Sequence, residues 1–258
     1  MKITSIVENT SCCEEIGCEH GLSLLIETNE HKILFDMGQT DLFAENAEKL
    51  GIDLKDVDIA VLSHGHYDHG GGLKRFLELN RKAPVFLNRH AFEPHYNGTE
   101  KYIGLNTELQ DSERLIFTGE EFHIDDGLTL YACNQKSKRF KINPDNLNVL
   151  KDGKFVAEDF CHEQYLMIEE NGKRVLVSGC SHKGILNLTD WFQPDVLLGG
   201  FHFMKITDEK MLTDCARRLD SFPTEFYTFH CTGTEQFRLM EPHMDWLHYL
   251  SAGQTVTI

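Results

Sequence analysis

Four strong metal-binding side chains lie within six residues of this chain, in the sequence His64-Gly65-His66-Tyr67-Asp68-His69. An apolar run that predicts a buried strand precedes them, and three glycines follow, which permit a tight backbone path. Imidazole and carboxylate groups hold zinc and other first-row transition metals. Residues i and i+2 of an extended segment point the same way, so His64 and His66 can bind one ion while Asp68 and His69 bind a second. The alternative, a histidine-rich surface turn, is disfavoured because functional residues concentrate in loops that follow buried strands.

Length and charge restrict the class of protein. A chain of 258 residues can bury the core of one large domain, and nothing in it requires two, so we expect a single domain over residues 1–258. Lys and Arg number 25 against 41 Asp and Glu, which leaves a net charge of −16. This balance argues against nucleic acids and anionic membranes as partners. The oligomeric state is left open.

The N-terminal residues lack the long apolar core of a signal peptide, and no run reaches the ~18 apolar residues of a membrane span. We therefore expect a cytoplasmic protein without a membrane anchor. Its eight cysteines are then expected to be reduced thiols. Cys12, Cys13 and Cys18 could together bind a metal cluster, although their spacing matches no known iron–sulfur motif.

Hydrophobic periodicity predicts two successive series of strands, each accompanied by helices. Gly51 is placed to end the first helix, and Asn171-Gly172 fits the turn of a hairpin. This order indicates an α/β fold, an αββα sandwich in which ligands emerge from strand ends along one edge. Residues 88–110 have no clear period and are expected to contain a helix or a lid over the site. The predicted strands cover residues 21–27, 32–36, 58–63, 84–87, 114–117, 128–131, 165–168, 174–178, 195–200 and 225–229, and the predicted helices 41–50, 73–79 and 208–219.

The rest of a metal shell should come from side chains at later strand ends. Cys180 and His182 stand at the tip of an apolar strand that stops at Gly179, and a thiolate is a good ligand for a soft or borderline ion. Further imidazoles follow other apolar runs or lie between them, at His162, His202 and His230.

Taken together, these residues resemble the metallo-β-lactamase-fold hydrolase superfamily, and the resemblance covers most of the chain. The H-x-H-x-D-H signature of the superfamily matches residues 64–69, and its Asp-then-Gly element is similar to Asp36-Met37-Gly38. Its third histidine falls about 18 residues before the position of Cys180, which His162 satisfies. The resemblance implies two divalent transition metal ions, zinc with iron or manganese as alternatives, held by His64, His66, Asp68, His69, His162, Cys180 and His230.

Within the superfamily, the chain is more similar to the branch named after 7,8-dihydropterin-6-methyl-4-(β-D-ribofuranosyl)aminobenzene-5′-phosphate synthase, an enzyme of methanopterin biosynthesis. Several separate blocks carry this resemblance in the same order, and they lie at residues 36–39, 62–72, 179–185, 199–202 and 230–233. Many superfamily members have a bridging Asp where this chain has Cys180, so this thiol could bridge two ions, bind one, or lie nearby as a buried core residue.

The resemblance also suggests roles in catalysis. Asp68 would help to orient a metal-activated water. His182 and His202 are candidates for proton transfer or for holding a phosphate or carboxylate, and the alternative for both is to support a metal ligand or to lie buried in the core. A basic segment at residues 136–141 could attract an anion or be a solvated loop. The aromatic side chains expected in the lid could stack on a planar ring or serve packing, and they are Phe92, Tyr96 and Tyr102.

Three function classes follow. We favour a metal-dependent hydrolase that acts on a small anionic substrate such as a phosphate ester or lactone. The second is a transferase that joins a dihydropterin to a phosphorylated ribofuranosylaminobenzene, as the branch name implies. The third is a metal-bound redox or sensor protein, for which two iron ions would be needed.

Overall fold

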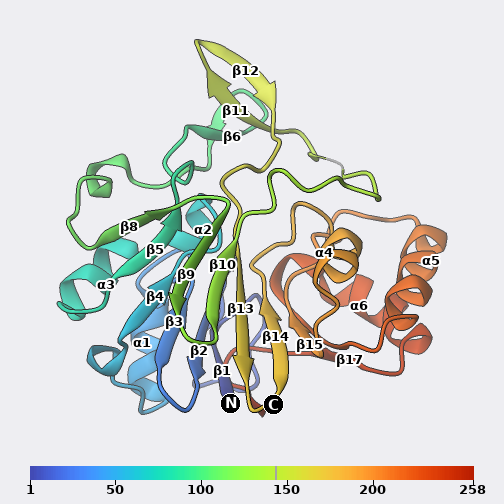
Figure 1. Cartoon of the computed structure of the whole chain (residues 1–258), viewed down its shortest axis with the longest axis horizontal. Helices are drawn as coiled ribbons and strands as arrows, with labels where there is room; N and C mark the ends of the chain where they lie inside the picture. Colours follow the sequence, from blue (N-terminus) through green and yellow to red (C-terminus); the bar gives the residue numbers. More distant parts are fainter. Residues whose placement is uncertain (143) are drawn as a thin grey trace.

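Two β-sheets lie face to face, with helices on both outer sides (Figure 1). The computed structural model describes residues 1–142 and 144–258. The predicted αββα sandwich is confirmed. The first sheet has the strand order β18-β1-β2-β3-β4-β5-β8. Its strands are β1 (Lys2–Val7), β2 (Ser23–Glu27), β3 (Lys32–Phe35), β4 (Ile59–Val61), β5 (Val85–Asn88), β8 (Leu115–Thr118) and β18 (Thr255–Thr257).

The second sheet has the order β17-β16-β15-β14-β13-β10-β9. Its hairpin between β13 and β14 turns at Asn171 and Gly172, whose φ angles of 54° and 77° suit a tight hairpin turn. The strands are β9 (Glu121–Asp125), β10 (Leu128–Tyr131), β13 (Tyr165–Glu170), β14 (Lys173–Val177), β15 (Val196–Leu198), β16 (Glu225–Thr228) and β17 (Leu247–Tyr249).

Helices cover the outer face of each sheet. Those against the first sheet are α1 (Leu42–Lys49) and α3 (Leu73–Leu79), and those against the second are α4 (Ile185–Phe192), α5 (Glu209–Asp220) and α6 (Thr234–Met240). The short α2 (Tyr67–Gly70) lies in the histidine loop. Single-turn helices are η1 (Leu54–Asp56), η2 (Thr107–Leu109), η3 (His230–Thr232) and η4 (Glu241–His243). No helix in the described ranges is long and apolar enough to cross a bilayer.

The main core lies between the two sheets. Strand β10 shows why, since Leu128 and Leu130 are buried there while Thr129 and Tyr131 are only partly covered. Side chains alternate between the faces of a strand, so one face of each sheet enters the core. Each fully buried Leu, Ile or Phe contributes about 1.5–3 kcal/mol. This core holds the strand ends, and thus the site at one edge, in fixed positions.

A four-stranded sheet, which we call the cap sheet, stands over that edge (Figure 1). It consists of β6 (His95–Asn97), β7 (Lys101–Tyr102), β11 (Leu147–Lys151) and β12 (Lys154–Ala157). Residues 88–110 therefore supply two cap strands and η2, without the α-helix that was one of the two expectations. Tyr96 packs edge-to-face on Tyr102 and on Phe155, which favours the packing role for these aromatic rings.

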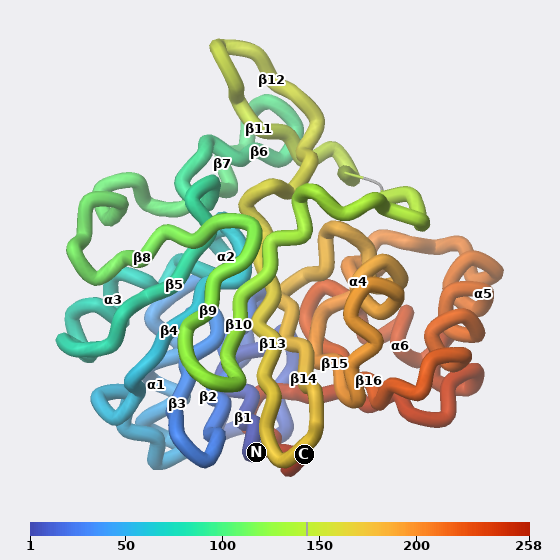
Figure 2. Tube along the Cα trace, viewed as in Figure 1, coloured from blue at the N-terminus to red at the C-terminus, as the bar shows by residue number. Residues whose placement is uncertain are grey.

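The two ends of the chain lie side by side (Figure 2). Strand β1 pairs with both β2 and β18, and the N-terminal amino group donates to the carbonyl of Ile258. The sequence analysis did not predict β1. Its burial pattern explains this, because every residue after Lys2 in the strand is buried, so the strand lacks the polar and apolar alternation of a half-exposed strand.

Candidate metal centre

The histidine loop begins where β4 ends and passes directly into α2. His66 caps the helix, and the backbone N–H groups of His69 and Gly70 both donate to its carbonyl oxygen. Gly65 is required by close approach, because a Cβ there would lie 2.1 Å from the carbonyl oxygen of Ala91. Asp68 and His69 therefore project from one helical turn, and the two other histidines project from the extended segment before it.

The first group of candidate ligands is His64, His66 and His182. Their candidate ligand atoms all lie within 4.8 Å of one another, and the three side chains are buried. The Nε2 atoms of His64 and His66, and both ring nitrogens of His182, have no hydrogen-bond partner. Unpaired buried polar groups are costly and uncommon. Their convergence is what a metal-binding group requires.

The second group surrounds His69. Its Nε2 atom lies 3.2 Å from His230 Nε2 and 3.2 Å from Cys180 Sγ, and Asp68 Oδ2 lies 3.4 Å from His230 Nε2. Ligands about 2.1 Å from a tetrahedral zinc lie about 3.4 Å from one another. The spacing in this group thus fits a single ion. His20, which the sequence analysis did not single out, lies 3.3 Å from Asp68 Oδ2.

A buried carboxylate fixes the tautomers of two of these histidines. Asp36 accepts from the backbone N–H and the hydroxyl of Ser63, and its Oδ2 lies 2.6 Å from His69 Nδ1. Because the Ser63 hydroxyl donates to Asp36, it must accept from His64 Nδ1, which lies 2.8 Å away. In their neutral forms both imidazoles then carry their proton on Nδ1. Their Nε2 lone pairs are left free for a metal.

The backbone is strained at the same place. Four residues of the site have φ angles between 51° and 60°, a region that residues other than glycine rarely adopt. They are Asp36, Ser181, His202 and His230. Such residues cost about 1–3 kcal/mol each and cluster at functional sites. The side chains of Glu8 and Asn9 hold one of them, since the His230 backbone N–H donates to the buried carboxylate of Glu8 and His230 Nδ1 lies 2.8 Å from Asn9 Oδ1.

Burial and charge set the protonation states that a metal would need. Burial and neighbouring imidazoles hold the pKa values of His64, His66 and His182 well below the ordinary range, so these rings are neutral near pH 7. Burial opposes ionisation of Asp68, but the contacts with His69, His20 and His230 outweigh it and lower its pKa. A neutral imidazole and an ionised carboxylate are the forms that bind metal.

His69 behaves differently without a metal. Burial disfavours its charged form, but the neighbouring carboxylates of Asp36 and Asp68 outweigh burial and raise its pKa to about 9. Metal binding at Nε2 must then displace a proton at neutral pH.

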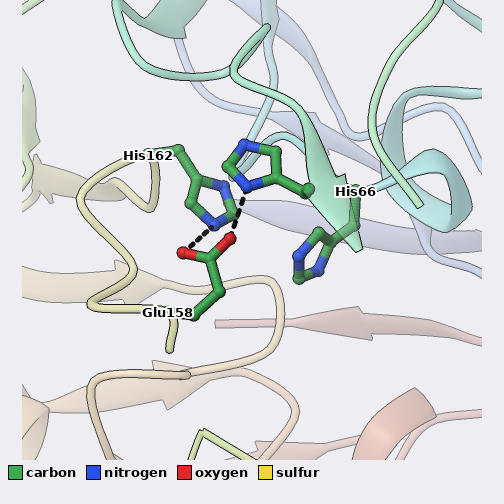
Figure 3. A group of neighbouring side chains, drawn as sticks. His66, Glu158 and His162 are labelled. Atoms are coloured by element: carbon green, nitrogen blue, oxygen red, sulfur yellow. Dashed lines mark hydrogen bonds and ion pairs between the residues drawn. The ribbon is translucent and has the colours of Figure 1, made fainter. Parts of the chain in front are cut away.

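His162 lies beside the group that the sequence analysis expected it to complete, with its ring centroid 5.0 Å from that of His66 and 5.7 Å from that of His64. Its Nδ1 accepts the backbone N–H of Gly65, and its Nε2 faces Glu158 at 3.7 Å (Figure 3). With His66, His95 and Glu158 it forms a buried group that shares His66 with the first one and whose candidate ligand atoms also lie within 4.8 Å of one another. Its Nε2 atom, like that of His66, has no hydrogen-bond partner. His182, which the sequence analysis gave as a candidate for proton transfer or anion binding, is a second imidazole beside this group, with its ring centroid 4.9 Å from that of His64 and 5.0 Å from that of His66. The ligand role of His162 therefore stays a prediction.

His202 and Cys231 adjoin Cys180 at the wall of the site. Burial opposes protonation of His202, but the hydrogen bond and charge of Cys231 outweigh it and raise its pKa. Burial likewise opposes ionisation of Cys231, while hydrogen bonds with Cys180 and His202 lower its pKa well below the ordinary value. Proton-exchanging groups therefore stand next to the candidate ligands.

A cavity of about 230 Å³ opens onto both ligand groups. Lys101, within the cap sheet, and Ile103, next to it, line this cavity. Lys205 lines it as well. The basic segment at residues 136–141 does not line this cavity; Arg139 and Lys141 border a different hollow beside α5. Candidate ligands that also line the cavity are His66, Asp68, Cys180, His182 and His230.

Comparison with known proteins identifies the family. The family model described as the metallo-beta-lactamase superfamily matches residues 16–227. The chain therefore belongs to the metallo-beta-lactamase superfamily, and it carries buried His and Asp groups that could hold metal.

Individual relatives agree with this assignment. The chain is 31% identical over 245 residues to the uncharacterized protein MJ0448 of Methanocaldococcus jannaschii, covering 90% of both chains. It is 28% identical over 266 residues to the 7,8-dihydropterin-6-methyl-4-(beta-D-ribofuranosyl)-aminobenzene-5′-phosphate synthase of the same organism, covering 92% of this chain and 90% of the relative. The crystal structure of Tm1679, a metal-dependent hydrolase of the beta-lactamase superfamily, matches with a TM-score of 0.85 at 29% identity over 100% of this chain and 99% of that one.

Proposed function

We propose that this protein is a binuclear metal-dependent hydrolase of a small anionic substrate. The observation that carries the proposal is that two adjacent buried ligand groups lie at one cavity. One group has imidazole nitrogens without hydrogen-bond partners. In the other, the candidate ligand atoms lie about 3.2–3.4 Å from one another. The likeness to Tm1679, which is described as a metal-dependent hydrolase, supports the reaction class.

His64, His66 and His182 would hold one ion. Asp68, His69 and His230 would hold the other, and Cys180 lies close enough to His69 to serve that ion as well. Imidazole, carboxylate and thiolate donors favour zinc, with iron or manganese as alternatives. In this assignment His182 is a metal ligand, and proton transfer is left to His202.

Bound divalent ions would lower the pKa of a coordinated water and polarise the substrate. Asp68 is ionised and can accept a hydrogen bond from the attacking water, which orients it. His202, whose raised pKa favours the protonated ring, can donate a proton to the leaving oxygen of the substrate. The cap sheet and the buried walls limit the access of bulk water to these groups.

Two lysines support an anionic substrate. Lys101 Nζ lies 3.5 Å from the hydroxyl of Tyr67, and Lys205 lies 2.7 Å from Asp145, both at the cavity. Cations at the mouth of a cleft raise the local concentration of anions. A phosphate ester or a lactone carboxylate product would be attracted there, although the chain as a whole is acidic.

The dihydropterin synthase relative suggests a transferase as a second candidate. Such an enzyme must hold a pterin and a phosphorylated ribofuranosylaminobenzene together. Pockets for drug-sized ligands measure about 300–1,000 Å³, whereas this cavity measures about 230 Å³. The smaller volume favours one small substrate and hydrolysis.

Metal analysis and a substrate screen test the proposal. Protein purified without chelator should contain close to two transition metal ions per chain, and it should hydrolyse at least one member of a panel of chromogenic phosphoesters and lactones. The variant His66→Ala should lose one ion and the turnover, and His123→Ala, which alters an exposed histidine far along β9, should lose neither. Less than one ion per chain after reconstitution would refute the proposal. Two iron ions without turnover would point to the redox or sensor class, and pterin-dependent coupling without hydrolysis to the transferase.

A further inference from the structure

A buried group of three side chains stands behind the histidine loop, on the side of the cap sheet (Figure 3). His95 comes from β6, Glu158 follows β12, and His162 lies in the loop before β13. None of the three is more than 5% exposed. Glu158 accepts from His95 Nδ1 at 2.5 Å and faces His162 Nε2 at 3.7 Å.

The contacts of His162 decide which of its nitrogens holds the proton. The backbone N–H of Gly65 donates to His162 Nδ1 at 2.8 Å. An N–H can only donate, so Nδ1 must offer its lone pair, and a neutral imidazole then carries its proton on Nε2. That Nε2–H points toward the carboxylate of Glu158. His162 could ligate a metal through Nε2 only as an imidazolate anion, because both lone pairs would be in use.

We propose that His162 is a positioning residue that fixes Gly65, through the hydrogen bond to its Nδ1, between the two metal-binding histidines His64 and His66. This inference rests on the proposed metal site, and it replaces the expectation that His162 is a ligand. In the group with His66 and His95, the pairing of His95 with Glu158 leaves the Nε2 atoms of His66 and His162 without a hydrogen-bond partner, and we assign no ion of its own to this group.

Gly65 is where such control matters most. Its neighbours on both sides are candidate ligands, and its Cα is pressed against the carbonyl of Ala91, so that a Cβ would lie at 2.1 Å. The hydrogen bond to His162 Nδ1 satisfies the buried backbone N–H of Gly65. Without it, the peptide would lose a partner and the directions of both flanking imidazoles could change.

The same network joins the cap sheet to the loop. The backbone N–H of Glu158 donates to the carbonyl oxygen of Leu147 at the start of β11, and its carboxylate accepts a hydrogen bond from His95 Nδ1 of β6. Glu158 thus joins two cap strands beside His162, whose Nε2 lies 3.7 Å from its carboxylate. The position of the cap and the geometry of the first ligand group are set together.

Substitutions that imitate one nitrogen at a time test the inference. The side-chain oxygen of Asn occupies the place of Nδ1, so His162→Asn keeps an acceptor for Gly65 N–H but offers no nitrogen at the position of Nε2. His162→Ala removes both. His182→Ala is the matched control that removes a proposed ligand. Zinc per chain, zinc affinity by chelator competition, and the visible absorption spectrum of the cobalt-substituted protein are measured for each, with circular dichroism to verify folding.

We expect wild type and His162→Asn each to bind two ions, with affinities within about threefold and the same cobalt spectrum. His162→Ala should bind two ions with about 10–100-fold weaker affinity, as is typical for groups that orient ligands. His182→Ala should bind one. Loss of one ion or of a cobalt band in folded His162→Asn would overturn the inference, as would three ions in the wild type. If His162→Ala does not fold, His162→Asn alone decides, and a metal-free wild type would overturn the proposed function and this inference with it.

Discussion

Replacing Asp36 by Asn should weaken metal binding at both ligand groups although Asp36 is itself no ligand. The carboxylate is fully buried and accepts three hydrogen bonds, two from Ser63 at 2.7 Å and one from His69 Nδ1 at 2.6 Å. In Asp36→Asn the amide oxygen can retain the backbone N–H of Ser63. The amide NH₂ then takes the place of Oδ2 and meets two donors.

The substitution can be satisfied only by moving protons. His69 can accept from the new NH₂ through Nδ1, but its proton then moves to Nε2, the atom that faces His230 and Cys180. The Ser63 hydroxyl can also accept from the NH₂ and donate to His64 Nδ1, which gives His64 the same unsuitable tautomer. The fold should lose about 1.5–3 kcal/mol, the contribution of a hydrogen bond to a charged group.

Metal affinity should fall by about 10–100-fold per ion, the usual effect of removing a group that orients a ligand, which is equivalent to about 1.4–2.8 kcal/mol. Chelator competition with zinc measures it. Ser63→Ala is the control, because it removes the partner of His64 while the contact between Asp36 and His69 persists, so one ion alone should weaken. Unchanged affinity for both ions in folded Asp36→Asn would refute the tautomer argument.

Three other predictions follow from the site and the thiols. Gly65→Ala should cost about 1–3 kcal/mol of stability through overpacking and reduce bound zinc, because its Cβ would clash with Ala91. The control Gly51→Ala, whose Cβ would have no neighbour within 4 Å, should keep its zinc. Equal zinc in the two variants would contradict the steric argument. The pKa of His69 is raised to about 9 without metal, so zinc binding should release a proton and become stronger as pH rises from about 6.5 to 9. Calorimetry in buffers of different ionisation enthalpy measures the released proton, and pH-independent binding would refute the prediction. The metal-free protein should lose stability over the same pH interval. A thiol reagent should modify the exposed Cys12, Cys13 and Cys18 quickly in the native protein, the partly buried Cys161 more slowly, and the four buried thiols only after unfolding. Fast modification of any of the four buried thiols would be the contrary result.

The sequence was most informative about features whose residues are close neighbours in the chain. The loop from His64 to His69 carries four candidate ligands within one turn and one strand end, so local geometry alone predicts that they converge. Strand positions with strong periodicity were also predictable, as β10 and the β13–β14 hairpin show. Both kinds of feature depend on neighbours in the chain.

Features that depend on distant pairing were missed. The contacts of His230 with Glu8 and Asn9 join residues more than 220 positions apart, and no local pattern marks either partner. The cap sheet pairs β6 with β11, and its strands are too short and too exposed to show a clear period. The ligand role that the family resemblance gives to His162 stays a prediction, since spacing does not tell which of its nitrogens accepts the backbone N–H of Gly65.

The acidic charge of the chain is compatible with an anionic substrate because of how charge is distributed at the site. The first ligand group contains only imidazoles, which burial keeps neutral. The second adds one carboxylate, Asp68, and at most one thiolate, Cys180. Asp145 and Cys231 also line the cavity, where Lys101 and Lys205 offset their charge. Two divalent ions would add four positive charges against the two negative ones of Asp68 and Cys180, so the loaded cavity would be cationic within a protein of net charge −16. Because this field arises inside a buried cleft, salt screens it less than it screens surface charge. Raising the ionic strength should therefore slow the encounter with the substrate more than it weakens binding of the substrate once inside.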